Sequence, residues 1–512
     1  MIKLKNIKEK ISMHPIMSFI VLIFITIILS GLLSIFGVHS SYNRVNTNTL
    51  ELETVNVEVE SLFSLSGLKY IFSNTVSNFV NFAPLSMFLI ILIGIGVMER
   101  SGFLRSFFTI ITKYSSKNKV TFFLILFSLI GSIMGDISYM IILPLGALLF
   151  KYGKRNPLAG VIISFAGLSC GSGVNILISS IDSSLLKYSN NAVKLLDANY
   201  VISNYAFLFI MLVVTIILSI VLTILTEKFV IPRLDKYESK YEDSVNISKK
   251  ELKGLIIGLG AGIIYMLFFV YNIIPGLPLS GNLLDYSEVN YIDKLFGYNS
   301  FFNSGFVFVI TIFFIILGVF YGIGSKNIKS IKDVGDQLSH SLDSFGGTIV
   351  LIFLASAFIS IFKKTNMGTV FCAILTNLIA DSSVSGLVLV FFLLIVSMAS
   401  TLFLPSSVYK WAILSGSVIP LFMNAGMSAE FSQVIFRAGE CISSCLTPLG
   451  AYFVIYLGFL HHYNQSDNVI GINQSIRFMV PYAFATLCVW IVVLLLWYFT
   501  GFPLGINSYP FI

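Results

Sequence analysis

Charged residues are scarce in this sequence, and their scarcity excludes a water-soluble domain. Of the 512 residues, 11% are charged and 56% are hydrophobic, whereas soluble domains carry about 25% charged residues. Uncharged apolar stretches such as Ile16–Val38, Phe207–Leu225 and Phe301–Ile323 approach the roughly 20 residues that a helix needs to cross hydrocarbon. The alternating pattern of a membrane β-barrel is absent, and backbone groups in lipid must bond within their own segment. We therefore expect an all-α polytopic membrane protein.

Further absences limit the chemistry. The five cysteines include no CxxC pair and the five histidines form no ligand set, so neither a disulfide framework nor a metal site is predicted, apart from Na⁺ as a candidate coupling ion. No GxxxxGK[ST] string is present, so ATP is not expected to drive the protein, and no cofactor is expected. The net charge of +7 resides in short loops beside the apolar stretches, a distribution that sets orientation in a bilayer rather than binding to nucleic acid.

The charge distribution also predicts the organisation of the chain. Lys3–Lys10 is basic and the segment Ser40–Leu68 is acidic, so the N-terminus is expected in the cytoplasm. We predict a cytoplasmic segment at 1–14, a first membrane half at 15–226, a cytoplasmic linker at 227–253, a second membrane half at 254–500 and an external tail at 501–512. The basic loops after the spans near 83–97, 120–150 and 302–323 are expected on the cytoplasmic side as well.

Two apolar stretches are interrupted by small polar residues. The first, at about 159–186, is broken at Ser169–Asn175, and the second, at about 387–419, is broken at Ser400–Ser407. Broken helices persist at membrane depth only where protein or a polar cavity satisfies the freed backbone, so these stretches point to a binding site. One break in each half suggests an inverted repeat. We expect about nine transmembrane helices and two re-entrant helical hairpins.

Four local strings resemble the AbgT family, the p-aminobenzoyl-glutamate transporters, in order and approximate separation along nearly the whole chain. They are Gly96-Val-Met-Glu-Arg-Ser-Gly102, Gly135-Asp-Ile-Ser-Tyr139 leading to Pro144, Leu168-Ser-Cys-Gly-Ser-Gly-Val-Asn175 through Ile181-Asp182, and Lys410-Trp411 followed by Arg437 and Thr447-Pro448. The resemblance implies a homodimer with nine spans and two hairpins per subunit that moves folate-pathway compounds.

Some positions depart from the family pattern. Thr401 stands where the family usually has Asn, Val408 where it has a small Ser, Ala429 where it has Pro, and Glu440 where it has Asp. The departures leave the expected fold unchanged and leave the substrate and the coupling ion open.

The interrupted stretches supply the first candidate residues. Asn175 lies in the first, where an amide oxygen beside unwound carbonyls suits Na⁺ or a substrate; alternatively it caps a broken helix. Thr401, Ser406 and Ser407 hold the matching place in the second, with hydroxyls for a cation or a substrate carboxylate, or for close helix packing. Asp182 is a candidate H⁺ or Na⁺ site because a carboxylate in apolar surroundings is costly unless paired; the alternative places it in headgroup water.

The remaining candidates lie nearer the C-terminus, with one exception. Arg437 and Glu440 are three residues apart and share a helix face, either as a structural pair or with Arg437 binding a substrate carboxylate while Glu440 holds it in place or takes part in coupling. Trp411 is a candidate to stack on an aromatic ring, or an interface anchor. Pro448 is expected to kink its helix and free a carbonyl. Asp136 is a weaker coupling candidate, since a turn at the membrane face explains it equally well.

The sequence thus predicts a secondary transporter of the bacterial cytoplasmic membrane, not an enzyme. We expect it to bind an anionic aromatic solute where the two hairpins meet, to take up p-aminobenzoyl-glutamate or export sulfonamide-type drugs, and to use an H⁺ or Na⁺ gradient. Three alternatives stay open at this point. They are an ion-coupled carboxylate transporter of the broader ion-transporter superfamily, an intramembrane enzyme, for which only Asp182 and Glu440 qualify, and a passive channel.

Overall fold

The computed structural model describes residues 13–512 apart from 47–50, 175, 177–178, 236, 238–246, 290, 297–298, 302–304 and 467. Ten helical stretches of the described chain are long and apolar enough to cross a membrane, which confirms the polytopic helical prediction. Most of the cytoplasmic segment predicted at 1–14 lies outside the described residues. The division into two membrane halves, the count of nine spans and the inverted repeat stay predictions.

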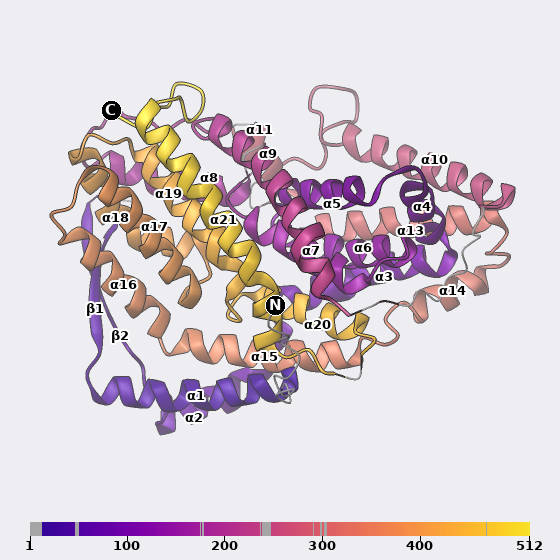
Figure 1. Cartoon of the computed structure of the whole chain (residues 1–512), viewed down its shortest axis with the longest axis horizontal. Coiled ribbons are helices and arrows are strands. Elements are labelled where there is room, and N and C mark those ends of the chain that lie inside the picture. Colours follow the sequence, from indigo (N-terminus) through magenta and orange to yellow (C-terminus); the bar gives the residue numbers. More distant parts are fainter. Residues whose placement is uncertain are drawn as a thin grey trace, which may run out of the picture.

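Helices make up most of the described chain (Figure 1). Those before residue 230 are α1 (Pro15–Ile35), α2 (Leu65–Val80), α3 (Ala83–Ser101), α4 (Phe103–Tyr114), α5 (Lys117–Gly131), α6 (Ile137–Tyr152), α7 (Pro157–Cys170), α8 (Ser180–Val193) and α9 (Leu208–Leu225). Those after it are α10 (Lys249–Tyr271), α11 (Tyr291–Phe296), α13 (Phe306–Ser325), α14 (Ile331–Ser339), α15 (Gly346–Lys364), α16 (Met367–Ala380), α17 (Gly386–Phe403), α18 (Ser407–Asn424), α19 (Ala429–Ser443), α20 (Ala451–Tyr463) and α21 (Ile472–Thr500).

Both predicted interruptions are present. Helix α7 ends at Cys170 and α8 begins at Ser180, and α17 ends at Phe403 before α18 begins at Ser407. The first break closes with a capping box, in which Ser179 accepts from the backbone of Asp182 while the Asp182 carboxylate accepts from the backbone of Ser179. Both stretches extend further than predicted, to Val193 and Asn424. The prediction ended each stretch where polar residues begin, but these residues continue the helices.

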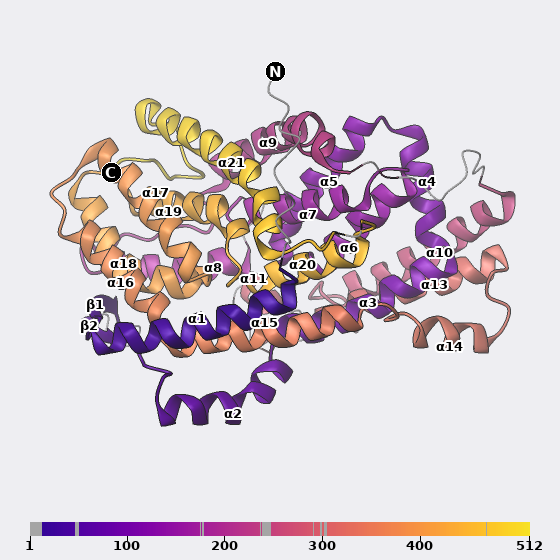
Figure 2. The ribbon, with the colours of Figure 1, turned by 60° about the horizontal axis from the view of Figure 1, so that its bottom comes forward.

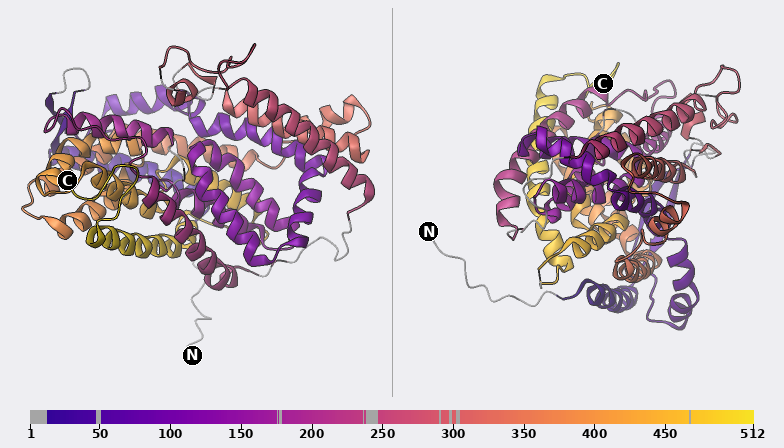
Figure 3. Two further views of the ribbon diagram at one scale, coloured as in Figure 1. Left: turned by 90° about the horizontal axis from the view of Figure 1, so that it is seen from above. Right: turned by 90° about the vertical axis from the view of Figure 1, so that its right-hand side faces the viewer.

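One end of the molecule is a three-helix unit of α3, α10 and α13, with α4 and α14 beside it (Figure 1). Glycines bring these helices together: a Cβ on Gly258 of α10 would lie 2.9 Å from the Leu317 carbonyl oxygen of α13, and one on Gly318 of α13 would lie 3.0 Å from the Met98 nitrogen of α3. Small residues allow such approach in membranes, where helices associate through close packing. The C-terminus lies at the opposite end of the molecule (Figure 3).

The centre is formed by α7 and α19, in which every residue is buried. Helix α7 crosses α6 so closely that a Cβ on Gly160 would lie 2.2 Å from the carbonyl oxygen of Gly146. Helix α19 packs against α17, α18 and α21. It carries Glu430, Arg437 and Glu440 among its 15 residues, so three charged side chains are enclosed in the middle of the protein.

The segment between the first two helices holds structure that the sequence pattern did not predict. Strands β1 (His39–Val45) and β2 (Leu52–Glu58) pair antiparallel, and β1 packs against α18 and α16. A hydrogen bond from Arg44 across the pair holds the pKa of the Glu53 carboxyl below its usual value. Helix α2 follows and packs against α15 on the outside of the molecule, below α1 and α15 in Figure 2. Helix α16 was also not predicted.

Loops that were predicted on one side of the membrane meet one another. Lys151 pairs with Glu99 at 2.9 Å and Arg155 pairs with Glu227 at 2.6 Å. Arg100 also pairs with Asp343 at 3.0 Å. These pairs join the ends of α3 and α6 to the segments after α6, α9 and α14. The side of the membrane on which these segments lie stays a prediction.

The predicted external tail at 501–512 is not a free tail. Leu504 is fully buried, its carbonyl oxygen accepts from Phe209 and Ile210 at the start of α9, and the Ser428 nitrogen donates to Pro510. The tail therefore covers the beginnings of α9 and α19.

Candidate functional site

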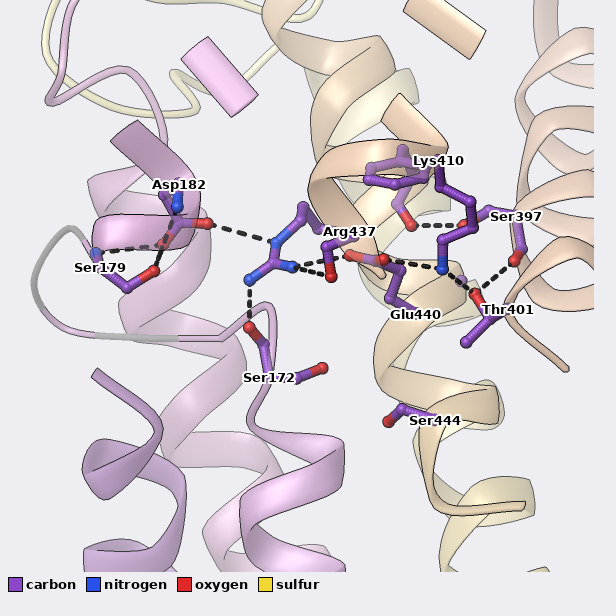
Figure 4. A network of polar contacts seen from close by, with 12 residues as sticks. Ser172, Ser179, Asp182, Ser397, Thr401, Lys410, Arg437, Glu440 and Ser444 are labelled. Atoms are coloured by element: carbon purple, nitrogen blue, oxygen red, sulfur yellow. Dashed lines mark hydrogen bonds and ion pairs between the residues drawn. The ribbon is translucent and has the colours of Figure 1, made fainter. Parts of the chain in front are cut away.

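Arg437 and Glu440 form the centre of a buried network on α19 (Figure 4). Their three-residue spacing places both on one face of the helix, and Arg437 Nη1 donates to Glu440 Oε2 at 2.6 Å. Both side chains are almost completely enclosed, with exposed fractions of 1% and 3%. Burial of two ions is costly unless their hydrogen bonds are satisfied, so the other partners of this pair decide what the network does.

The first broken stretch meets Arg437 from one side. Asp182 Oδ1 lies 3.2 Å from Arg437 Nε, and the carbonyl oxygen of Ser172 accepts from Arg437 Nη2. The backbone approaches closely at Gly173, where a Cβ would lie 2.9 Å from Arg437 Cβ. The unwound chain after α7 is therefore held directly on α19, as expected for a break whose freed backbone groups need protein partners.

The second broken stretch meets Glu440 from the other side. Lys410 Nζ of α18 lies 2.8 Å from Glu440 Oε1 and donates to Thr401 Oγ1 of α17 at 2.6 Å. Ser407, in the first turn of α18, accepts from Arg437 Nη1 at 3.4 Å. Residues of both breaks thus converge on two side chains of one helix, and Figure 4 shows them as one continuous chain from Asp182 to Thr401.

We call Asp182, Arg437, Glu440 and Lys410 the charged cluster. Its two acidic and two basic side chains give a formal charge of zero. Its ends differ in accessibility, because the Asp182 side chain is 13% exposed whereas that of Lys410 is 0% exposed. The Asp182 end is therefore the more accessible end of the cluster.

Three buried polar atoms of this network lack aligned hydrogen bonds among the described residues. They are Arg437 Nε and Glu440 Oε1, whose contacts with Asp182 and Lys410 are ion pairs, and Ser172 Oγ. An unsatisfied buried polar group costs about 1–3 kcal/mol. A ligand that offers a hydrogen-bond acceptor to Arg437 Nε would satisfy the guanidinium. The hydrogen bonding of Arg437 is therefore incomplete within the described residues.

The other predicted site residues are less closely connected to the cluster. Ser406 is exposed and caps α18 by accepting from Tyr409. Trp411 is fully buried, packs against Phe436 with ring centroids 4.6 Å apart and ring planes tilted by 34°, and donates to Ser189 Oγ at 2.8 Å. Asn175 lies outside the described residues. The substrate-binding roles of these three residues stay predictions.

Two candidates occupy helix interruptions. Pro448 follows α19 in the stretch between Leu446 and Ala451 that separates it from α20, as a proline there predicts. Asp136 precedes α6, is exposed and faces the Tyr452 hydroxyl rather than the charged cluster.

The sequence interpretation missed Lys410 and Ser172 as site residues. Lys410 stood in the quoted string beside Trp411, and a lysine within an apolar stretch is itself a signal of function. Ser172 acts through its carbonyl group, which every residue carries, so no side-chain pattern identifies it. The described residues hold no group of three or more metal-ligating side chains, and a cavity of about 370 Å³ between α2 and α15 is lined by none of the cluster residues.

Many apolar helices, two of them broken, and a buried charged cluster between the breaks define the class of polytopic membrane transporters. The AbgT putative transporter family model matches residues 4–512, and the chain belongs to this family. The chain is accordingly a transporter and not an enzyme.

A curated relative agrees with this assignment. The chain is 28% identical over 498 residues to the p-aminobenzoyl-glutamate transport protein of Escherichia coli (strain K12), with 97% of this chain and 94% of that protein covered. Among solved structures, the YdaH transporter of Alcanivorax borkumensis is 26% identical, with coverage of 96% and 100% and a TM-score of 0.48. MtrF of Neisseria gonorrhoeae, described with a class of antimetabolite efflux pumps, is 27% identical, with 97% of each chain covered and a TM-score of 0.49.

Proposed function

We propose that this transporter moves amphiphilic aromatic carboxylates of the p-aminobenzoyl-glutamate type, sulfonamide-type compounds, or both, by secondary active transport. The observation that carries the proposal is the incompletely satisfied Arg437 guanidinium between the two breaks. Arginine binds a carboxylate through two parallel hydrogen bonds, and a glutamyl group supplies carboxylates. The name of the Escherichia coli relative supports this substrate class.

The substrate carboxylate takes the place of Asp182 on Arg437 in this proposal. The cluster is neutral when closed, so an entering carboxylate adds one negative charge in surroundings where an unpaired ion is costly. Asp182 then needs a cation, and its 13% exposure leaves it open to one. A proton or Na⁺ on Asp182 would couple the gradient to substrate movement, with Thr401 and Glu440 holding the far side of the cluster.

The surroundings of the protein complete the proposal. We infer a bacterial cytoplasmic membrane, with the N-terminus and the segments 100–119, 151–155, 227–253 and 326–332 in the cytoplasm, because these four segments carry most of the basic residues. We also infer a homodimer, in which the part bearing α7–α8 and α17–α18 moves against a scaffold. Import as symport and export as antiport can use the same inward ion gradient, and they differ in whether the substrate moves with the ion or against it.

Flux measurements in proteoliposomes test the proposal. Labelled p-aminobenzoyl-glutamate and a labelled sulfonamide are followed under an imposed H⁺ or Na⁺ gradient for the unmodified protein, Asp182→Asn and Arg437→Ala. We expect saturable flux that one gradient drives and that both variants lose. Non-saturable flux would indicate a channel, flux that neither gradient changes would refute coupling, and normal flux in both variants would refute the site.

A carboxylate transporter of broader specificity is the second candidate, because Arg437 binds a carboxylate whatever the rest of the solute. Competition by the two fragments separates the candidates. Glutamate carries the carboxylates and p-aminobenzoate carries the ring. If glutamate alone competes as well as the whole molecule, the ring is not recognised and the broader transporter is supported.

A further inference from the structure

Lys410 lies in an enclosed pocket of oxygen atoms on the inner side of the charged cluster. Its ammonium group is 2.6 Å from Thr401 Oγ1 and 2.8 Å from Glu440 Oε1, and the Phe436 ring lies 5.5 Å from Nζ. The side chain is 0% exposed. These surrounding groups come from two helices: Thr401 from α17, and Glu440 and Phe436 from α19. Helix α18 supplies the lysine itself. The thiol of Cys372 on α16 is also among its neighbours.

The orientation of the Thr401 hydroxyl is fixed by a second hydrogen bond. Thr401 Oγ1 donates its hydrogen to the carbonyl oxygen of Ser397 at 2.7 Å, so only its lone pairs face the ammonium. Ser397 is in turn anchored, because its Oγ donates to the carbonyl oxygen of Phe436 at 2.6 Å. A hydroxyl oxygen and a carboxylate oxygen presented in this way are ligands that a hard cation prefers.

We propose that the Lys410 ammonium is a tethered cation that occupies a monovalent-cation site between α17, α18 and α19, and thereby excludes free Na⁺ from it. The charge of the cluster supports this assignment. With Lys410 the formal charge is zero, and without Lys410 it is −1, which one Na⁺ restores. The inference rests on the proposed function only in that the site belongs to a transporter, and it confines any free coupling cation to the Asp182 end.

The experiment replaces the tethered cation with a free one and needs no substrate. Lys410→Ala removes the ammonium and leaves Thr401 and Glu440 in place. Thermal unfolding of the purified full chain is measured in NaCl and in choline chloride at equal ionic strength. We expect a saturable rise in melting temperature with Na⁺ for Lys410→Ala, and a smaller or absent rise for the unmodified protein and for Lys410→Arg, which keeps the positive charge.

Two controls locate the effect. Adding Glu440→Gln to Lys410→Ala removes the carboxylate and restores a formal charge of zero, so the Na⁺ response is expected to disappear. Lys363→Ala, at an exposed lysine of α15, is expected to behave as the unmodified protein.

The outcomes distinguish this inference from the transport proposal. Equal Na⁺ responses of the unmodified protein and Lys410→Ala would overturn the tethered-cation assignment while leaving the Arg437 substrate site untouched. Recovery of folded Lys410→Ala in Na⁺ but not in choline supports it, and failure to recover the variant in either salt overturns it, since Na⁺ would then not replace the ammonium. Loss of substrate flux in Arg437→Ala bears only on the transport proposal.

Discussion

Asp182 and Arg437 join the unwound chain between α7 and α8 to the centre of α19. The carboxylate divides its two oxygens between two tasks: Oδ1 lies 3.2 Å from Arg437 Nε, while Oδ2 accepts from the Ser179 nitrogen at 3.2 Å and from Ser179 Oγ at 2.6 Å. Release of Arg437 therefore leaves the N-terminus of α8 capped. The unwound chain can therefore release Arg437 of α19 while α8 stays helical.

Asp182→Asn separates these two tasks. Asparagine keeps an oxygen that accepts the cap hydrogen bonds but carries no charge for Arg437, so the guanidinium is left to attract a substrate anion. We expect tighter substrate binding and loss of gradient-driven flux, measured by equilibrium binding in detergent and by flux in proteoliposomes.

Ser179→Ala is the matched control for that variant. It removes the capping hydroxyl and leaves the Asp182 charge in place, so it is expected to cost about 1 kcal/mol of stability without changing the response to the gradient. Unchanged coupling in Asp182→Asn would show that the proton or sodium site lies elsewhere.

Arg437→Ala is expected to destabilise the protein as well as abolish binding. It leaves Asp182 and Glu440 with Lys410 as the one remaining cation of the cluster, and removal of one partner from a buried ion pair typically costs about 3–5 kcal/mol. The double variant Arg437→Met, Glu440→Met leaves Asp182 and Lys410, again with a formal charge of zero. We expect it to recover part of the lost stability in thermal unfolding while binding stays absent; substrate binding by the double variant would contradict the role of Arg437.

Trp411→Phe tests whether the indole serves the substrate or the fold. Its ring packs against Phe436 and its nitrogen donates to Ser189 Oγ, so the hydrogen bond that Phe lacks is expected to cost about 1 kcal/mol. Ser189→Ala removes the same bond from the other side, together with the bond that Ser189 Oγ donates to Gln433 Oε1 at 2.6 Å. We expect lower melting temperatures and unchanged preference for aromatic over aliphatic carboxylates in both variants. A change of that preference in Trp411→Phe alone would instead indicate direct stacking on the solute.

Gly160→Ala tests the closest helix crossing. The added Cβ would lie 2.2 Å from the carbonyl oxygen of Gly146, and backbone atoms cannot move aside as a flexible side chain does, so a loss of at least about 1–3 kcal/mol is expected. Gly260→Ala on α10 is the control, because nothing lies within 4 Å of the added atom. Thermal unfolding of both variants in detergent measures the difference, and equal stability would mean that α6 and α7 are further apart than described.

The membrane helices were predictable because lipid requires each span to be apolar and to bond its backbone groups within the segment. Several smaller elements were not predictable. Interruptions at Ser169–Asn175 and Ser400–Ser407 followed from small polar residues within apolar stretches. The strand pair gave no such signal, since His39–Val45 and Leu52–Glu58 are short and largely polar and are held by contacts with α16 and α18. Contacts between residues far apart in sequence, such as Ser428 with Pro510, likewise cannot be read from local composition.

The site was predicted in part. Arg437 with Glu440 followed from helical spacing, and Asp182 followed from the cost of a carboxylate in apolar surroundings. The convergence of both breaks on one helix face did not, because it depends on how α8, α17, α18 and α19 pack. That packing also gives Lys410 its place between Thr401 and Glu440.

Strand β1 packs so closely on α18 that a Cβ on Gly416 would lie 2.5 Å from the Asn43 carbonyl oxygen. The strand pair therefore contacts α18 at a distance from the charged cluster, and a reagent that binds the strands would also act on this helix. We expect an antibody fragment that binds β1, β2 and a neighbouring helix together to restrict the movement of α18. Such a fragment would inhibit transport without competing with the substrate.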